Sequence, residues 1–187
     1  MAQRNDENTC DVMFVEVSTT QADPGEEERA IANNSMASPD TTGATAGKIV
    51  EVGFYIDNGA NGETLDVEVG LYTDAGNDEP ETLLYSATGT TGTAEDGWKT
   101  IAVDWDISPS TVYWLAVACE TAIASPQIDY DRFNSPAGYA YKAGTGKSLL
   151  ADWGTSDTKD LDGLTMIYAV TEAAPSTGGM GNDLYVY

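Results

Sequence analysis

The sequence predicts an all-β fold, either a sandwich or a barrel, and three observations lead to that prediction. Short segments alternate between apolar and polar residues with a period of two, or form short apolar runs. Polar turns that contain Gly, Asn, Asp or Pro separate these segments at short intervals. The only helix signal lies in residues 24–32, which begin with an acidic turn and could equally be a charged loop.

The expected strands account for most of the chain between residue 48 and residue 171. In the segment 64–72, for example, Leu65, Val67, Val69 and Leu71 fall on one face, as in a half-buried strand. The other expected strands are 11–18, 48–56, 82–87, 98–105, 111–119, 127–130, 138–142 and 165–171.

The chain of 187 residues is expected to form a single domain with extended terminal arms. Residues 1–46 are expected to be an N-terminal arm with one early strand, and residues 47–172 the sandwich. Residues 173–187 read as a linker followed by an apolar tail. The tail, Leu184, Tyr185, Val186 and Tyr187, alternates like a short strand, so we expect it to serve assembly by docking on a neighbouring subunit.

The charge balance excludes several classes of function. There are 8 basic and 31 acidic residues, a net charge of −23, and no histidine. Nucleic acid and anionic membrane surfaces need basic patches, so neither is an expected partner. Without histidine there is no Ser–His–Asp catalysis and no His-ligated zinc. The acidic surface is typical of salt-adapted proteins, which favours a halophilic or marine source over an ordinary acidic mesophile.

Targeting signals are absent from the sequence as it stands. The first residues are polar, without the apolar core of a signal peptide, so we expect synthesis in a cytoplasm without standard export. No stretch approaches the roughly 20 apolar residues of a membrane span, so membrane insertion is not expected. Of the two cysteines, Cys119 ends an apolar run and is expected to be buried. A Cys10–Cys119 disulfide requires the first strand to lie beside the later one, and this remains open.

Oxygen ligands gather in two acidic turns. Asp57, Asn61 and Glu63 lie in one turn, and Asp74, Asn77 and Asp78 in the other, with the chemistry that Ca²⁺ prefers. Ordinary polar turns explain them equally, because neither has EF-hand spacing. Apart from such a calcium ion no cofactor is expected. No carboxylate pair lies in a recognisable catalytic motif, so we do not expect an enzyme.

Aromatic side chains offer a possible sugar-binding platform. The four tryptophans are Trp98, Trp105, Trp114 and Trp153, and most are more simply explained as core. Trp114 lies in an apolar strand and is expected to be buried. Trp153 lies in a loop-like context, so it is the candidate for an exposed ring that stacks on a glycan, with Tyr139 and Tyr141 beside it.

The segments 49–56, 67–76, 83–86 and 113–117, together with Gly97-Trp98, carry a family resemblance over about residues 48–120. The chain here resembles jelly-roll β-sandwich modules of the carbohydrate-binding or lectin-like type, which occur on virion fibres and spikes and on secreted proteins. The resemblance implies a single jelly-roll-like β-sandwich. It implies no one function, because a sandwich can host unrelated roles.

Two functional interpretations follow. The first is a non-enzymatic structural protein on the virion surface, made in the host cytoplasm, as a capsid decoration or a fibre or spike component. Its partners would be itself, as a homotrimer, other virion proteins and a host-surface glycan, and its arms would bury exposed sheet edges. The alternative is an extracellular carbohydrate-binding adhesin or secreted binding module.

Overall fold

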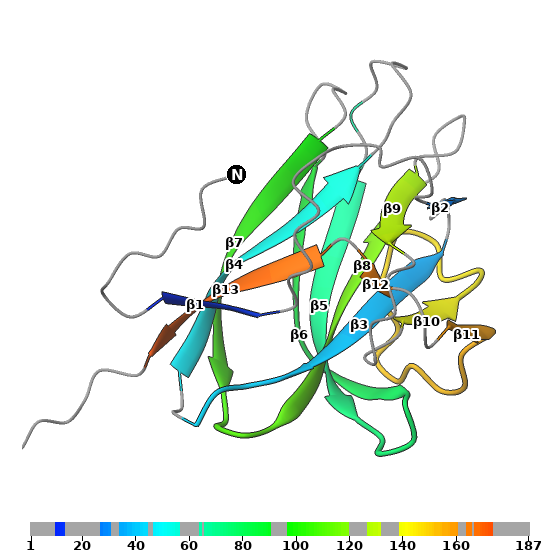
Figure 1. The fold of residues 1–187 in the computed structure, drawn as a ribbon. Coiled ribbons are helices and arrows are strands. Elements are labelled where there is room, and N and C mark those ends of the chain that lie inside the picture. The colour runs from blue at the N-terminus through cyan, green and yellow to red at the C-terminus, as the bar shows by residue number, and fades with distance from the viewer. Residues whose placement is uncertain are drawn as a thin grey trace, which may run out of the picture.

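The fold consists of strands joined by turns and loops (Figure 1). The computed structural model describes residues 10–13, 27–30, 34–44, 47–56, 64, 66–90, 97–119, 127–131, 139–160, 164–165 and 167–173. The strands are β1 (Cys10–Met13), β2 (Glu27–Ala30), β3 (Ser35–Thr41), β4 (Gly47–Ile56), β5 (Asp66–Asp74), β6 (Pro80–Thr90), β7 (Gly97–Ile107), β8 (Val112–Cys119), β9 (Gln127–Asp131), β10 (Tyr139–Lys142), β11 (Thr158–Asp160), β12 (Leu164–Thr165) and β13 (Ile167–Ala173). In this part of the chain, no helix has the length and apolarity needed to cross a membrane.

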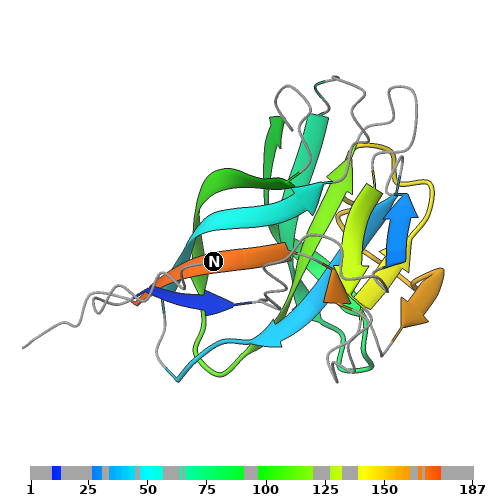
Figure 2. The same ribbon diagram turned by 45° about the horizontal axis from the view of Figure 1, so that its top comes forward.

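Two antiparallel sheets form the sandwich. One has four strands in the order β1-β13-β4-β7, and the other has six in the order β11-β10-β3-β8-β5-β6. Figure 2 shows the two layers from a second direction, with a smaller sheet, β12-β9-β2, at one end. The prediction of an all-β sandwich is confirmed.

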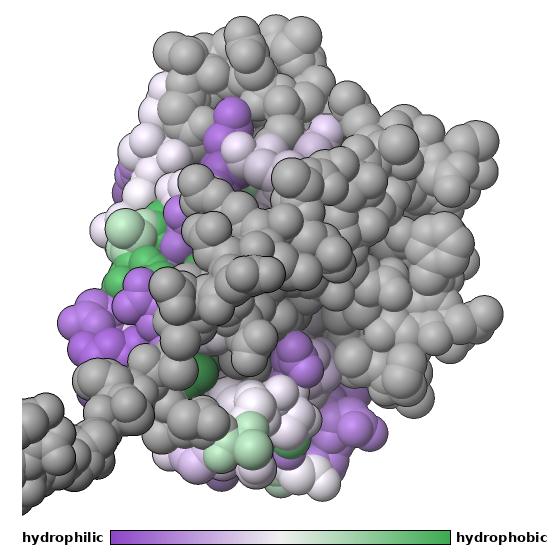
Figure 3. All heavy atoms as spheres, turned by 60° about the vertical axis from the view of Figure 1, so that its left-hand side comes forward, coloured by the Kyte–Doolittle hydropathy of each residue, from purple (hydrophilic) through white to green (hydrophobic). Residues whose placement is uncertain are grey.

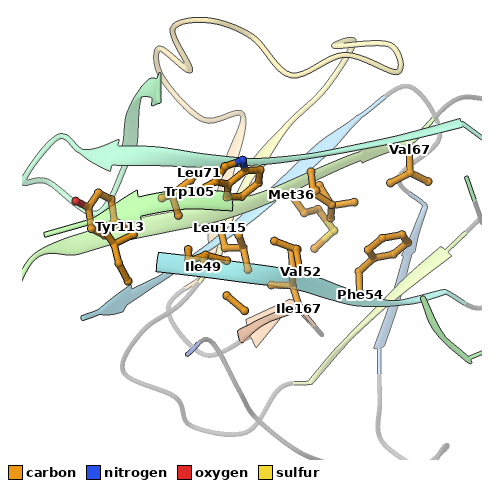
Figure 4. Packing of buried hydrophobic residues seen from close by; sticks show 14 of the residues in the cluster. Met36, Ile49, Val52, Phe54, Val67, Leu71, Trp105, Tyr113, Leu115 and Ile167 are labelled. Carbon is orange, nitrogen blue, oxygen red and sulfur yellow. The ribbon is translucent and has the colours of Figure 1, made fainter. Parts of the chain in front are cut away.

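The main core lies between the two large sheets. Val52 and Phe54 point inward from the four-stranded sheet and meet Leu71 and Leu115 from the six-stranded sheet (Figure 4). Val67, Val69 and Leu71 are all buried in this core, as the alternation in β5 predicts. Leu65 lies outside the described residues. This alternation defines which face of each strand is turned away from the core and is free for other contacts.

Strand β3 lies inside the six-stranded sheet, between β10 and β8, with Ser35 opposite Ala118 and Thr41 opposite Val112. This corrects the expected start of the sandwich at residue 47, because residues 35–41 are part of the sheet and not of an arm. The sequence Ser-Met-Ala-Ser-Pro-Asp-Thr has few strand-forming residues. Its burial depends on its place in the sheet: Met36 packs in the core between the two large sheets, and Ala37 packs on the opposite face.

The other N-terminal segments also pair with distant strands. Glu27–Ala30, within the expected helix or charged loop, is strand β2 and pairs with β9. The hydrogen-bonding partner decides the conformation here, not the local helix signal. The early strand is β1, which pairs with β13. Cys119 is buried as expected, and β1 and β8 lie in different sheets, so Cys10 and Cys119 do not come from paired strands.

A third layer covers part of the outer face of the six-stranded sheet. We call residues 147–157 the strap. Leu149 and Trp153 from the strap pack on outward-facing residues of this sheet, namely Ala37, Tyr72, Trp114, Ala116, Ala118 and Ala140. The Tyr72 hydroxyl donates to the Leu150 carbonyl at 2.7 Å, and the Leu149 N–H donates to a Glu68 carboxylate oxygen at 2.7 Å. Strands β3, β5, β8 and β10 of the six-stranded sheet therefore carry buried residues under the strap.

Candidate functional site

Trp153 does not form an exposed platform. Its side chain is 1% exposed, and its ring meets Tyr72 edge-on with the centroids 5.3 Å apart. The indole Nε1 donates to Ser156 Oγ at 2.9 Å, which satisfies its only polar atom. The prediction of an exposed Trp153 is therefore wrong, because the loop that carries it folds back onto an alanine-rich sheet face. Trp114 is buried beside it, as expected.

The two tyrosines expected to accompany Trp153 do not form a platform with it. Tyr141 is half-buried and packs against the main core between the sheets, whereas Trp153 lies in the cluster under the strap. Tyr139 begins β10, and its side chain lies outside the described residues. The structure therefore does not bring the three predicted glycan-binding side chains together around Trp153.

The second acidic turn is organised by hydrogen bonds and by a lysine. Asp74 accepts a hydrogen bond from Trp114 Nε1 at 2.8 Å. Lys159 Nζ lies 3.0 Å from the Asn77 carbonyl oxygen and 3.0 Å from Glu79 Oε1. Asp78 is exposed and has a positive φ of 59°. The Lys159 ammonium group thus lies beside this turn, in the position to which its oxygen atoms would attract a cation.

Asp57, Asn61 and Glu63, the first predicted calcium turn, lie outside the described residues, as do Leu184, Tyr185, Val186 and Tyr187 of the tail. Within the residues that the structure does describe, no group of three or more His, Cys, Asp or Glu side chains is placed to hold a metal ion.

An aromatic cluster lies on the outer face of the four-stranded sheet. Strand pairing places Tyr55 opposite Trp98, and Tyr168 opposite Gly53, on three neighbouring strands. The Trp98 ring meets Tyr55 edge-on at 5.7 Å between centroids and Tyr168 at 5.2 Å with a 58° tilt. Tyr55 is buried, and Trp98 and Tyr168 are half-buried, so both keep part of their surface open. We call Tyr55, Trp98, Tyr168 and Glu51 the aromatic cluster.

Gly53 is the reason that the cluster can close. A Cβ atom at this position would lie 2.1 Å from Tyr168 Cε1 and 2.2 Å from Cζ. The phenol ring therefore lies directly over the backbone of β4, in the place that any other side chain would fill. From there Tyr168 reaches across the sheet to both Trp98 and Glu51.

Glu51 supplies the polar part of the cluster. Its Oε1 atom and the Tyr168 hydroxyl are hydrogen-bonded at 3.1 Å, and the carboxylate is half-buried. A carboxylate beside partly open aromatic rings offers a hydrogen-bond acceptor and a flat apolar surface within one small area. Figure 3 shows the side of the molecule that faces left in Figure 1, where apolar side chains in green lie beside hydrophilic side chains in purple.

The sequence contains part of the signal for this cluster. Glu51, Gly53 and Tyr55 alternate with the buried Val52 and Phe54, so period two places them on the outer face. The partner Tyr168 is 117 residues away from Glu51, and only the pairing of β4 with β13 brings the two together. Trp98 is among the aromatic residues considered from sequence, but without strand register nothing distinguishes it from a core residue.

Comparison with known proteins identifies the fold. No protein family and no curated protein matches the chain. Among solved structures, the chain is similar to the cysteine protease and lectin-like domains of Cwp84, a surface-layer-associated protein of Clostridium difficile, with a TM-score of 0.52 and 13% identity. That match covers 83% of this chain and 37% of the other chain. A second structure of clostridial Cwp84, after propeptide cleavage, matches with a TM-score of 0.53 and 11% identity, over 83% of this chain and 42% of the other.

This chain therefore spans about two fifths of the length of the solved chains that it resembles. At this level of identity the similarity is one of fold, and it agrees with the all-β sandwich described above.

Proposed function

We propose that this protein is a carbohydrate-binding, lectin-like β-sandwich module that acts outside the cell or at a cell surface and carries out no chemical reaction itself. The observation that carries the proposal is the aromatic cluster on the outer face of the four-stranded sheet. The similarity in fold to a chain that includes lectin-like domains supports it. The surface-layer association of that neighbour supports the location.

The chemistry of the cluster suits a sugar. A pyranose ring has faces lined with C–H groups that stack on aromatic rings, and hydroxyl groups around its rim that donate to carboxylates. Trp98 and Tyr168 offer partly open rings, and Glu51 offers the acceptor. Tyr55 is buried beside Trp98 on the neighbouring strand and contacts the indole edge-on. The cluster is thus partly preorganised before a ligand arrives.

The other sequence interpretation, a structural protein of a virus particle, receives less support. The similar structures come from a bacterial surface-layer-associated protein, which favours the carbohydrate-binding alternative. Mass spectrometry of purified virus particles tests this interpretation. The chain in stoichiometric amounts in such particles would support a structural role in the virion.

The test is a glycan array followed by calorimetry with the best ligand. Trp98→Ala should weaken binding at least about tenfold, because it removes the central ring of the cluster. Val112→Ala is the matched control, since it shortens a 37% exposed apolar residue on the opposite sheet and should leave the affinity unchanged. Circular dichroism checks that both variants fold.

Tyr168→Phe separates stacking from hydrogen bonding, because it keeps the ring and removes only the hydroxyl beside Glu51. We expect a loss of about threefold to tenfold in affinity. The proposal fails if no glycan binds the wild-type protein, or if folded Trp98→Ala binds the same glycan as tightly as the wild type.

A further inference from the structure

Strand β6 is an edge strand whose two halves differ. It pairs with β5 on one side. On its other side the strap covers only its first residues: the Leu83 N–H donates to the Ala151 carbonyl at 3.0 Å, and the Trp153 N–H donates to the Glu81 carbonyl at 2.9 Å. Among the described residues, no segment pairs with this side of β6 between Leu84 and Thr90. We call residues 84–90 the open edge.

Proteins usually protect an exposed edge with charged residues, proline or bulges, which discourage pairing with another chain. In β6 these features gather where the strap already covers the strand: Pro80, Glu81 and the irregular pairing near Leu83. Leu84 is the residue left out of register, because Tyr85 pairs with Leu71 and Leu83 with Tyr72. From Tyr85 to Thr90 the open edge has none of these protective features. Leu84 is 42% exposed, and Ser86, Thr88 and Thr90 also face solvent.

The open edge is also uncharged in a chain of net charge −23. No charged residue occurs from Thr82 to Ala94. The strands at the other edges of the two large sheets are different, since all carry charged residues: Asp11 in β1, Lys99, Asp104 and Asp106 in β7, and Lys159 and Asp160 in β11. The open edge is therefore the place on the two large sheets where another copy of this acidic chain can approach with the least repulsion.

We propose that two copies of this chain associate through their open edges, strand β6 against strand β6, in antiparallel orientation. Such a pair has twofold symmetry, so the same residues meet on both sides of the axis. The short side chains of Ser86, Ala87 and Thr88 allow this close approach, and Thr and Ser pair well across antiparallel strands. The six-stranded sheet then continues from one copy into the other. The inference is independent of carbohydrate binding, because the aromatic cluster lies on the other sheet.

The proposed dimer should become tighter as the salt concentration rises. Each copy carries a charge of −23, so the two copies repel each other at low ionic strength, while the contact itself contains no ion pair that salt could weaken. Added salt screens the repulsion. We expect the dimer dissociation constant to fall at least about tenfold between roughly 50 mM and 1 M NaCl.

Sedimentation velocity over a range of concentrations measures the assembly state of the full chain. The double variant Ser86→Lys and Thr88→Lys places like charges opposite one another across the twofold axis, so it should raise the dissociation constant at least about tenfold. The control is the double variant Ala44→Lys and Val112→Lys, which adds the same charge at exposed positions after β3 and at the start of β8. Both variants bring the net charge closer to zero, so general repulsion alone would strengthen association in both.

A dimer that is weakened only by the β6 substitutions supports the proposal. A monomer at every salt concentration, a trimer, or equal association of the two double variants would overturn it. Circular dichroism and thermal unfolding at low concentration check that both double variants keep the wild-type fold.

Discussion

Two glycines in strand interiors create room for side chains from distant parts of the chain. A Cβ on Gly53 would lie 2.1 Å from the Tyr168 ring, and a Cβ on Gly70 would lie 2.4 Å from Leu149 Cδ1 in the strap. Glycine normally weakens a strand, because it costs backbone entropy and packs nothing. Here each position has no room for a side chain, because Tyr168 lies over Gly53 and Leu149 lies over Gly70. Gly53 makes the aromatic cluster possible, and Gly70 makes the docking of the strap possible.

Gly53→Ala tests the first of these contacts. The added methyl group must displace the Tyr168 ring, so we expect a loss of about 1–3 kcal/mol in unfolding free energy and a separation of Tyr168 from Trp98. Urea unfolding gives the free energy. In a Tyr168→Ala background the same glycine substitution should cost almost nothing, because the obstructing ring is gone. An equal cost in both backgrounds would contradict the contact.

At this scale the sequence predicts Trp114 but not Trp153. Trp114 lies in an unbroken apolar strand, so its burial follows from the local pattern. Trp153 is surrounded in sequence by Ala, Asp, Gly and Thr, which indicate a surface loop. It is buried because it packs on small residues of three strands, Ala37, Ala116 and Ala140. No local sequence pattern around Trp153 reveals this packing surface. For the same reason, the local sequence does not predict the contact between Tyr168 and Glu51.

Among the elements, the strap is held at its far end by the buried carboxylate of Glu79, which pairs with the partly exposed Lys159. The Glu79 carboxylate is hydrogen-bonded to the Ser156 hydroxyl, and its Oε1 atom lies 3.0 Å from Lys159 Nζ. The Glu79 side chain is 6% exposed, so its charge needs these partners. Lys48 forms the contrasting case. It lies 2.5 Å from Asp104 in the open, and this hydrogen bond with Asp104 raises the pKa of the Lys48 ammonium.

Lys159→Met should therefore destabilise the protein far more than Lys48→Met. The first leaves a buried carboxylate without its cation, which costs about 2–4 kcal/mol. The second removes a solvent-exposed pair and should change the melting temperature little, with no difference left at high salt. Both variants change the net charge by the same amount, so thermal unfolding compares the two sites directly. Equal losses would mean that Glu79 does not depend on Lys159.

The strands with regular alternation could be predicted from sequence, and β3 could not. Strands β4, β5, β7 and β8 combine apolar faces with clear turn signals, and the expected ranges overlap the observed ones. The first four residues of strand β3, Ser-Met-Ala-Ser, are buried on both faces of the sheet. The strand therefore shows no alternation of apolar and polar residues, and it contains few strand-forming residues. Its position is decided by β8 and β10, which follow it by many residues.

At the scale of the whole molecule, Tyr72 makes the free energy of unfolding depend on pH in the alkaline range. Burial, assisted by the charge of Glu68, raises the pKa of the Tyr72 phenol. Above about pH 10 the unfolded chain releases this proton, whereas the folded chain keeps it. The stability contributed by the protonated phenol is therefore complete below pH 10 and decreases as the pH rises further.

Tyr72→Phe should remove this dependence. We expect the variant to be less stable than the wild type near neutral pH, because it loses the hydrogen bond to Leu150. The difference should narrow above pH 10, as the slope of unfolding free energy against pH becomes shallower by about one proton. Urea unfolding from about pH 8 to pH 11.5 measures both slopes. Parallel curves for the two proteins would contradict the raised pKa.

The pairing of β1 with β13 determines how the sandwich responds to a pulling force. Cys10 is opposite Glu172, and Met13 is opposite Ala169, so the start of the first strand and the end of the last strand lie at the same end of the ladder. Tension applied at residues 10 and 173 would separate these two strands like a zipper, one hydrogen bond after another, and would not load the whole ladder in shear. If the module works at a cell surface under flow, this edge yields first, while the core between the two large sheets stays closed.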